Sequence, residues 1–222
     1  MKQLLIVMAL VATAHAQDFD GTWKVPDAQT LPKCSDQKTC LRLAWTAEAG
    51  IRTPGDDNAK RLGKALDYHT KACTFGKQKP CANAERVQKK LDAAKALKSD
   101  AEKTAFWCAD ALEGAARFEA GSKTAPTIVT SACGPLFPPK FKKGLDAIGG
   151  MGGDSKGELM LELAREELCP GLKTKPEACQ RTKTTAKLSA AKITEMLGSI
   201  FKAALPADVA SRADELAMWM MK

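Results

Sequence analysis

The chain has 222 residues and a formal net charge of +8 at pH 7. This length suffices for one domain with a sizeable hydrophobic core or for two smaller halves. The low aromatic content of 5%, the abundance of Ala and Lys and the near absence of β-branched runs argue against a β-sheet protein. The basic surface favours acidic partners such as anionic glycans, lipid headgroups or acidic proteins.

The first 16 residues have the features of a secretory signal peptide. A short basic start, Met1-Lys2, precedes an apolar run over 4–12, and Ala14-His15-Ala16 provides an Ala-x-Ala cleavage signal. No later run approaches the roughly 20 uninterrupted apolar residues that a membrane-spanning helix needs. We therefore expect export, with a secreted, extracellular location or a periplasmic one in a bacterium.

Eight cysteines follow the signal peptide: Cys34, Cys40, Cys73, Cys81, Cys108, Cys133, Cys169 and Cys179. An even number in an exported chain predicts four disulfides. Proximity favours Cys34–Cys40, Cys73–Cys81 and Cys169–Cys179, which leaves Cys108–Cys133. The alternative, in which some cysteines join neighbouring helices, stays open because connectivity cannot be deduced from sequence.

In the first half of the chain, residues 17–33 show no period and predict an extended arm. Apolar residues then recur at three- and four-residue steps, which predicts helices over 40–50, 57–73, 82–98 and 99–121. Asp56 and Asp57 are candidate N-caps, and Ser99 with Glu102 forms a capping-box pattern that predicts a break between the last two helices.

The middle of the chain is predicted to be irregular. Residues 122–139 include Pro135, Pro138 and Pro139, which disfavour regular structure, and the string 127–130, the only plausible strand. A short helix is expected over 141–148. The glycine-rich segment 149–153 predicts a hinge between an N-terminal helical part, 17–148, with two or three disulfides, and a C-terminal helical part, 154–222.

In the C-terminal part, helical spacing predicts helices over 154–168 and 180–204 and a last helix from Pro206. The predicted fold is therefore all-α, a disulfide-stapled helical bundle of about seven to nine helices. Two cysteine-bracketed loops with Lys-x-Lys-Pro, and the nearly identical strings 90–95 and 187–192, suggest a degenerate internal repeat. Coincidence in a chain rich in Ala and Lys is the alternative.

The sequence offers no complete catalytic set. His69 is the only histidine after the signal peptide, no Gly-x-Ser-x-Gly elbow is present, and a buried structural histidine is the favoured interpretation. Oxidised cysteines leave no His and Cys set for zinc, so we expect no metal or cofactor. A cluster of glutamates could support a carboxylate-only hydrolase, although a solvated helix face is favoured: Glu158, Glu162, Glu166 and Glu167.

Two binding hypotheses remain. Clustered lysines are candidates for binding anionic glycans or membrane surfaces, although Lys is also common on exposed helices: Lys77, Lys79, Lys89, Lys90, Lys173 and Lys175. Nucleic acid is disfavoured because no aromatic stacking platform accompanies these lysines.

The second hypothesis is an apolar pocket between helices. The run Met218–Met221 offers adaptable apolar surface, although a terminal helix that docks on the core is the favoured interpretation. We expect a secreted, non-catalytic binding protein whose ligand is a lipid or another small apolar molecule. The alternative is a cationic secreted factor, defence- or toxin-like, that binds anionic surfaces.

Overall fold

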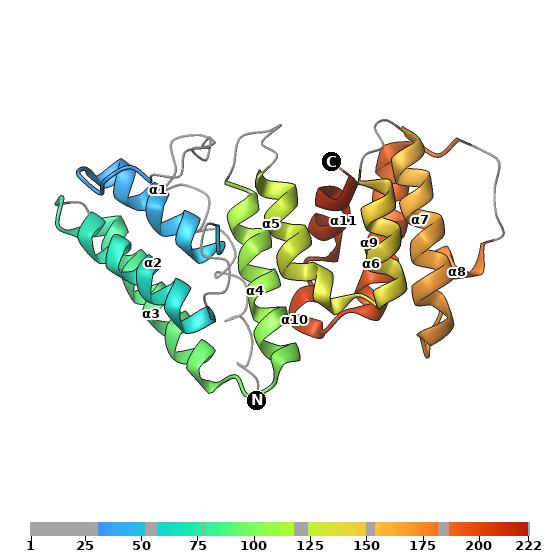
Figure 1. Ribbon diagram of the computed structural model, residues 1–222, viewed down its shortest axis with the longest axis horizontal. Helices are drawn as coiled ribbons and strands as arrows, with labels where there is room; N and C mark the ends of the chain where they lie inside the picture. Colours follow the sequence, from blue (N-terminus) through green and yellow to red (C-terminus); the bar gives the residue numbers. More distant parts are fainter. Residues whose placement is uncertain are drawn as a thin grey trace, which may run out of the picture.

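The computed structural model describes residues 31–51, 57–76, 78–117, 124–149, 154–181 and 187–221, and within them the fold is all-α (Figure 1). These parts contain eleven α-helices and two short 3₁₀ helices, and no strand is present in them. Nine of the α-helices have nine or more residues, while α8 and α10 have four each. The predicted all-α, disulfide-stapled fold class is thus confirmed, although the described residues contain eleven α-helices where seven to nine were expected, because the four-residue helices α8 and α10 add to the longer ones.

The helices of the N-terminal half are α1 (Gln37–Glu48), α2 (Asn58–Cys73), α3 (Gln78–Ala96), α4 (Asp100–Ala115) and α5 (Thr124–Cys133), followed by η1 (Gly134–Leu136) and α6 (Pro139–Ile148). The C-terminal half contains α7 (Asp154–Leu168), η2 (Cys169–Gly171), α8 (Glu177–Gln180), α9 (Ala190–Ala204), α10 (Ala207–Ala210) and α11 (Ala213–Met221).

Short polar side chains fix where several helices begin. The carboxylate of Asp57 accepts the amide N–H of Lys60 at 2.7 Å. Ser99 and Glu102 form the reciprocal capping box that their spacing predicts, so α3 and α4 are separate helices. Satisfying these otherwise unpaired amides stabilises each helix by about 1 kcal/mol.

The prediction of a strand at 127–130 is wrong, because this segment lies inside α5. Its β-branched residues suggested a strand, but Ala125, Val129, Ala132 and Cys133 are buried at helical spacing. Pro126 is tolerated because it occupies the first turn, where backbone N–H groups have no partner within the helix. Tertiary burial therefore decides the conformation of this segment.

The predicted helix over 180–204 starts later than expected. Ser189 accepts the amide N–H of Lys192 and is the N-cap of α9, so residues 187–189 precede the helix. The matching string 90–95 lies well inside α3. The two strings therefore do not occupy equivalent positions, and they do not support an internal repeat.

The helices form two groups joined by α4 (Figure 1). At one end α1 packs on α2 and α2 on α3, around a small core that contains Leu62, Val87 and Leu91. At the other end α6, α7 and α9 pack in sequence. In between, α4 contacts α1 and α2 on one side and α5 and α10 on the other.

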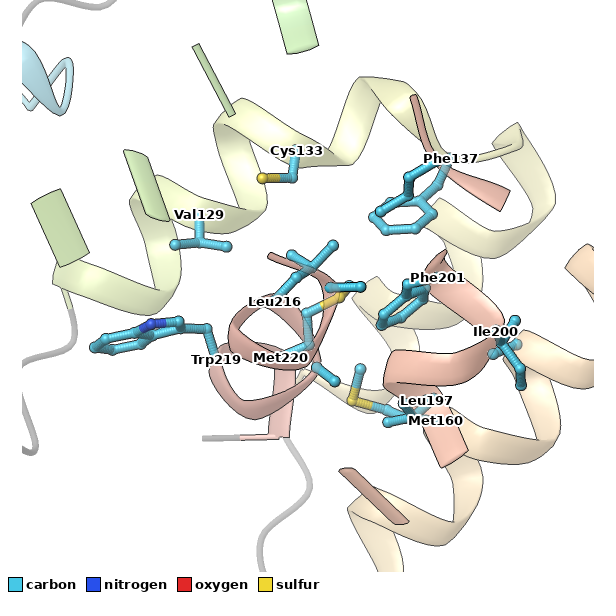
Figure 2. Packing of buried hydrophobic residues seen from close by; sticks show 14 of the residues in the cluster. Val129, Cys133, Phe137, Met160, Leu197, Ile200, Phe201, Leu216, Trp219 and Met220 are labelled. Carbon is cyan, nitrogen blue, oxygen red and sulfur yellow. The ribbon is translucent and has the colours of Figure 1, made fainter. Parts of the chain in front are cut away.

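The larger core surrounds α11 (Figure 2). Leu216 and Met220 of this terminal helix are buried with Leu197 and Phe201 of α9 and with Met160 of α7. The favoured interpretation of the Met-rich run, a terminal helix docked on the core, is therefore confirmed. This core includes residues before and after the glycine-rich segment 149–153.

The four disulfides follow the scheme of nearest cysteines: Cys34–Cys40, Cys73–Cys81, Cys108–Cys133 and Cys169–Cys179. The third joins α4 to α5, while the second closes the turn from α2 into α3. The first and last each fix a short connection next to a helix end. None of the four links the group α1–α3 to α4, so side-chain contacts must do so.

Several predictions fall on residues that are not described. The signal peptide 1–16, most of the arm 17–33, residues 150–153 of the hinge, and Lys77 lie outside the described residues, as does the side chain of Lys79. The division into parts 17–148 and 154–222 stays a prediction.

A glycine comparison tests how closely α1 approaches α4. A Cβ on Gly114 would lie 2.5 Å from the Cβ of Ala49, whereas a Cβ on Gly63 in α2 meets nothing within 4 Å. We expect Gly114→Ala to destabilise the protein by about 1–3 kcal/mol, and Gly63→Ala to stabilise it by up to about 1 kcal/mol. Chemical denaturation measures both changes, and a neutral Gly114→Ala would contradict the close packing of α1 on α4.

Candidate functional site

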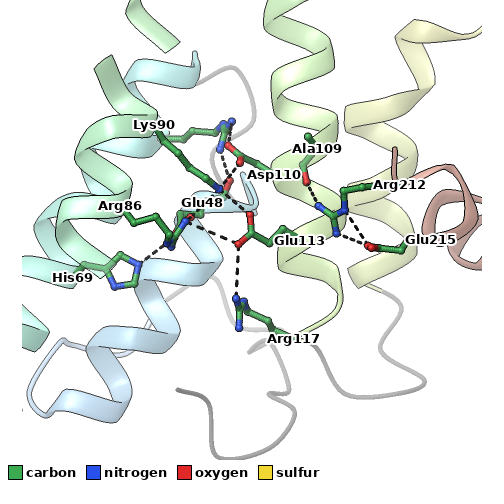
Figure 3. Close-up of polar contacts among 11 residues, drawn as sticks. Glu48, His69, Arg86, Lys90, Ala109, Asp110, Glu113, Arg117, Arg212 and Glu215 are labelled. Atoms are coloured by element: carbon green, nitrogen blue, oxygen red, sulfur yellow. Dashed lines mark hydrogen bonds and ion pairs between the residues drawn. The ribbon is translucent and has the colours of Figure 1, made fainter. Parts of the chain in front are cut away.

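The most unusual feature of the structure is a set of buried and half-buried charged side chains between α1, α2, α3 and α4 (Figure 3). At its centre is Glu48, the last residue of α1, whose side chain is 2% exposed. One carboxylate oxygen, Oε1, lies 2.8 Å from Nε2 of His69 in α2. His69 is itself fully buried, as the favoured interpretation of this histidine predicts.

Two cations of α3 complete the surroundings of Glu48. Arg86 forms a two-pronged pair with it, with N–O distances of 2.7 and 2.9 Å. Lys90 Nζ lies 3.6 Å from the second oxygen. These two residues are one helical turn apart on α3, so a single face of that helix supplies both charges. Three helices thus converge on one carboxylate.

The carboxylates of α4 bind the same cations (Figure 3). Lys90 Nζ lies 2.8 Å from Asp110 and 2.8 Å from Glu113. Asp110 also accepts a hydrogen bond of 2.6 Å from Arg61 of α2, and both of these side chains are buried. Arg61 in turn donates to the backbone carbonyl of Glu48. The network therefore joins α1, α2 and α3 to α4.

An aromatic ring packs beside these charges. The guanidinium carbon of Arg117 lies 3.5 Å from the centroid of the Trp45 ring, and that of Arg86 lies 4.6 Å from it. Trp45 also meets His69 edge-on, with ring centroids 5.5 Å apart. Such cation–π contacts hold the planar guanidinium groups in place against the ring.

The pairing decides the ionisation of the acids. Burial alone would raise the pKa of Glu48, but hydrogen bonds from His69 and Arg86 outweigh it and hold this pKa far below its usual range. Burial would likewise raise the pKa of Glu113, but the charge and hydrogen bond of the nearby Lys90 outweigh burial and lower this pKa. The pKa of Lys90 is raised because its carboxylate neighbours outweigh its desolvation. All three groups are therefore charged at neutral pH.

The one histidine of this arrangement is closed off from solvent. The ring of His69 is fully buried and its Nε2 is bound to Glu48, so it cannot reach a serine or a substrate from solvent. Within the described residues, no group of three His, Cys, Asp or Glu side chains is arranged to hold a metal ion. No described helix is long and apolar enough to cross a bilayer.

A second feature, a groove with a volume of about 540 Å³, is the candidate ligand site. It lies where the ends of α7 and α9 meet η1 and the loop closed by Cys169–Cys179. Its apolar walls include Leu136, Phe137, Pro138, Leu168, Leu172, Ala203, Ala204 and Leu205, and its polar lining consists of Glu167, Lys173 and Thr174, with Gly171.

Of the lysines singled out in the sequence, the four whose side chains are described do not lie on one surface. Lys89 of α3 and Lys173 and Lys175 of the second disulfide loop are exposed, but they belong to opposite ends of the molecule. Lys90 is engaged in the buried network, where three carboxylates already balance its charge. Only Lys173 lies at the groove.

The predicted glutamate cluster on α7 has the surroundings of a helix surface. Glu162 pairs with Arg165 at 3.0 Å, and Glu166 is exposed. Glu167 alone lines the groove.

Sequence reasoning missed both the buried network and the groove, since each unites residues from distant segments. The one available signal was the pair Arg86 and Lys90, a turn apart on an otherwise amphipathic helix.

Replacing Glu48 with Gln tests the network. This change removes the carboxylate that Arg86 pairs with at 2.7 and 2.9 Å and that His69 contacts at 2.8 Å, so we expect a loss of about 3–5 kcal/mol in the free energy of unfolding. The matched control Glu85→Gln, on the exposed side of α3, should change it by less than about 0.5 kcal/mol. Urea denaturation followed by circular dichroism measures both, and equal effects would contradict the network's role.

The network also predicts how stability depends on pH. The pKa values of Glu48 and Glu113 are lowered in the folded state, so their stabilisation is complete above the unfolded pKa of about 4.3 and is lost as the pH falls below it. The difference in melting temperature between wild type and Glu48→Gln should therefore be largest near neutral pH and shrink below about pH 4. A constant difference down to pH 2.5 would refute this assignment.

Comparison with known proteins supplies no relative for this arrangement. The chain matches no protein-family profile. No curated protein sequence and no solved structure is significantly similar to it. The fold and its candidate sites are therefore interpreted from their own chemistry.

Proposed function

We propose that this protein is an exported, non-catalytic carrier that binds a single-chain amphiphile, such as a fatty acid, in the groove between α7, α9 and η1. The observation that carries the proposal is the groove itself, whose volume of about 540 Å³ falls within the roughly 300–1,000 Å³ range of small-molecule sites. The four disulfides support an oxidising compartment.

The lining favours a ligand with one apolar and one polar end. Leucines from three separate segments, Leu136, Leu172 and Leu205, face the groove and would cover an acyl chain. Lys173 and Thr174 lie together on the disulfide loop and would hold a carboxylate head, whereas Glu167 would repel a second negative charge. A monoanionic amphiphile therefore fits better than a dianionic one.

The site is also held rigidly, which lowers the entropic cost of binding. Phe137 packs on Phe141 and Phe201, with ring centroids 4.7 and 5.4 Å away. On the opposite side, the Cys169–Cys179 disulfide restrains the loop that carries Leu172 and Lys173. Both walls of the groove are therefore anchored, one to the core and one by a covalent bond.

Filling the groove tests the proposal. A fluorescent fatty acid with a dansyl group at its tail should bind the disulfide-bonded protein saturably, with an increase in emission. Ala203→Trp places a large ring in the groove and should weaken binding at least about tenfold, since it removes several buried methylene contacts. The control Ala147→Trp alters an alanine of α6 that is likewise exposed and does not line the groove.

Lys173→Gln should weaken the binding of the fatty acid a few fold and leave the binding of the corresponding fatty alcohol unchanged. Only the carboxylate of the acid forms an ion pair with the Lys173 ammonium group. Failure of the probe to bind, or an equal loss in both tryptophan variants, would overturn the assignment of this groove.

A further inference from the structure

The free end of the α1–α3 group is a second candidate surface. Arg61, in the first turn of α2, contacts the last residue of α1, and His69 further along α2 packs against Trp45. The two helices therefore run antiparallel, so the start of α1 and the turn after α2 lie at the same end of the molecule (Figure 1). This end lies on the opposite side of the molecule from the helices α7 and α9 that line the groove (Figure 1).

Four large apolar side chains are exposed within the described residues, and one of them, Phe75 on the turn after α2, lies at this end and is 43% exposed. A second, Leu31, is 36% exposed and precedes Cys34 by three residues, and the Cys34–Cys40 disulfide ties Cys34 to the first turn of α1. The other two, Leu159 and Met218, lie on α7 and α11. Phe75 is the only aromatic residue among the four, and exposing it to water is unfavourable unless a partner covers it.

The turn that carries Phe75 is rigid. Its backbone N–H groups donate to helical carbonyls, Phe75 to that of Ala72 and Gly76 to that of Cys73. Gly76 has a φ of +88°, which a residue with a side chain rarely adopts, and the Cys73–Cys81 disulfide closes the turn. These contacts fix the backbone position of Phe75, whose side chain is 43% exposed.

The charge at this end of the molecule is mainly positive. Lys33 and Lys38 beside the start of α1 and Lys71 in the last turn of α2 are exposed. Asp36 is the acidic residue among them, and its carboxylate accepts two hydrogen bonds from Thr39. Asp67 is exposed one turn further from the end of α2. Lys71 lies one helical turn before Phe75 in sequence, and Lys38 lies at the start of α1, so this end combines an exposed aromatic ring with positive charge. Such a combination suits a partner with an apolar interior and an anionic surface.

We propose that this end docks reversibly on anionic lipid bilayers, with Phe75 and Leu31 inserted at the interface and Lys33, Lys38 and Lys71 against the headgroups. Interfacial binding of this kind needs only a few apolar side chains and added electrostatic attraction. Two exposed apolar residues are too few for a stable protein interface, which buries at least about 1,000 Å². A sulfated glycan would attract the lysines but would gain nothing from Phe75.

Co-sedimentation of the full disulfide-bonded protein with vesicles tests this inference. The protein should pellet with vesicles of phosphatidylcholine and about 30% phosphatidylglycerol, pellet far less with pure phosphatidylcholine, and be released by about 0.5 M salt. Phe75→Ala should weaken the partition about tenfold through lost apolar burial, while Leu159→Ala, which removes a similarly exposed side chain, should not. Lys71→Gln should weaken it more than Lys175→Gln.

The controls separate the possible failures. Because Phe75 is exposed, Phe75→Ala should keep the wild-type melting temperature, which excludes misfolding as the cause of lost binding. Ala203→Trp should bind vesicles like wild type, so the vesicle experiment tests the membrane proposal separately from the proposal of a ligand in the groove. The proposal is overturned if anionic vesicles are not bound, if Phe75→Ala and Leu159→Ala bind equally, or if heparin binds tightly while vesicle binding is insensitive to Phe75.

Discussion

The buried carboxylate of Glu48 is the constraint on which the arrangement of the first four helices depends. Removing it from water is expensive, and only several well-placed cations can offset that cost. His69 and Arg86 supply its hydrogen bonds from two different helices, so α1, α2 and α3 can satisfy this charge only in one mutual orientation. The network thus selects one orientation of these helices, whereas apolar packing alone would tolerate several.

The network matters more because the other ties are local. Each disulfide joins residues that are close in sequence, and none connects α1–α3 with α4. The small core of α1–α3 contains mainly Ala, Leu and Val, with Phe106 of α4 packed against it. Asp110 and Glu113 therefore provide the polar link between the two groups of helices, and Trp107 adds a hydrogen bond to the carbonyl of Ala49.

The features that sequence predicts well are those that depend on near neighbours. The caps at Asp57 and Ser99 and the pairing of adjacent cysteines need only short stretches of chain. The strand expected at 127–130 failed because burial against α4 and α11 outweighs the preference of β-branched residues. The network and the groove could not be predicted, because each joins residues that are distant in sequence. Glu48 and Asp110 are brought to the same Lys90 only by folding, and so are Leu136 and Leu205 to the same groove.

Hydrogen exchange measured by mass spectrometry across a range of pH tests the central claim most directly. If ion pairs hold α1–α3 on α4, acidification from about pH 7 to 3 should protonate Glu48 in opened states and lower the protection of α1 and α2 first. After correction for the intrinsic exchange rate, α9 and α11, which lie in the apolar core, should keep their protection. A uniform loss of protection across all helices would contradict the account, because it would mean that the two groups unfold as one unit irrespective of the network.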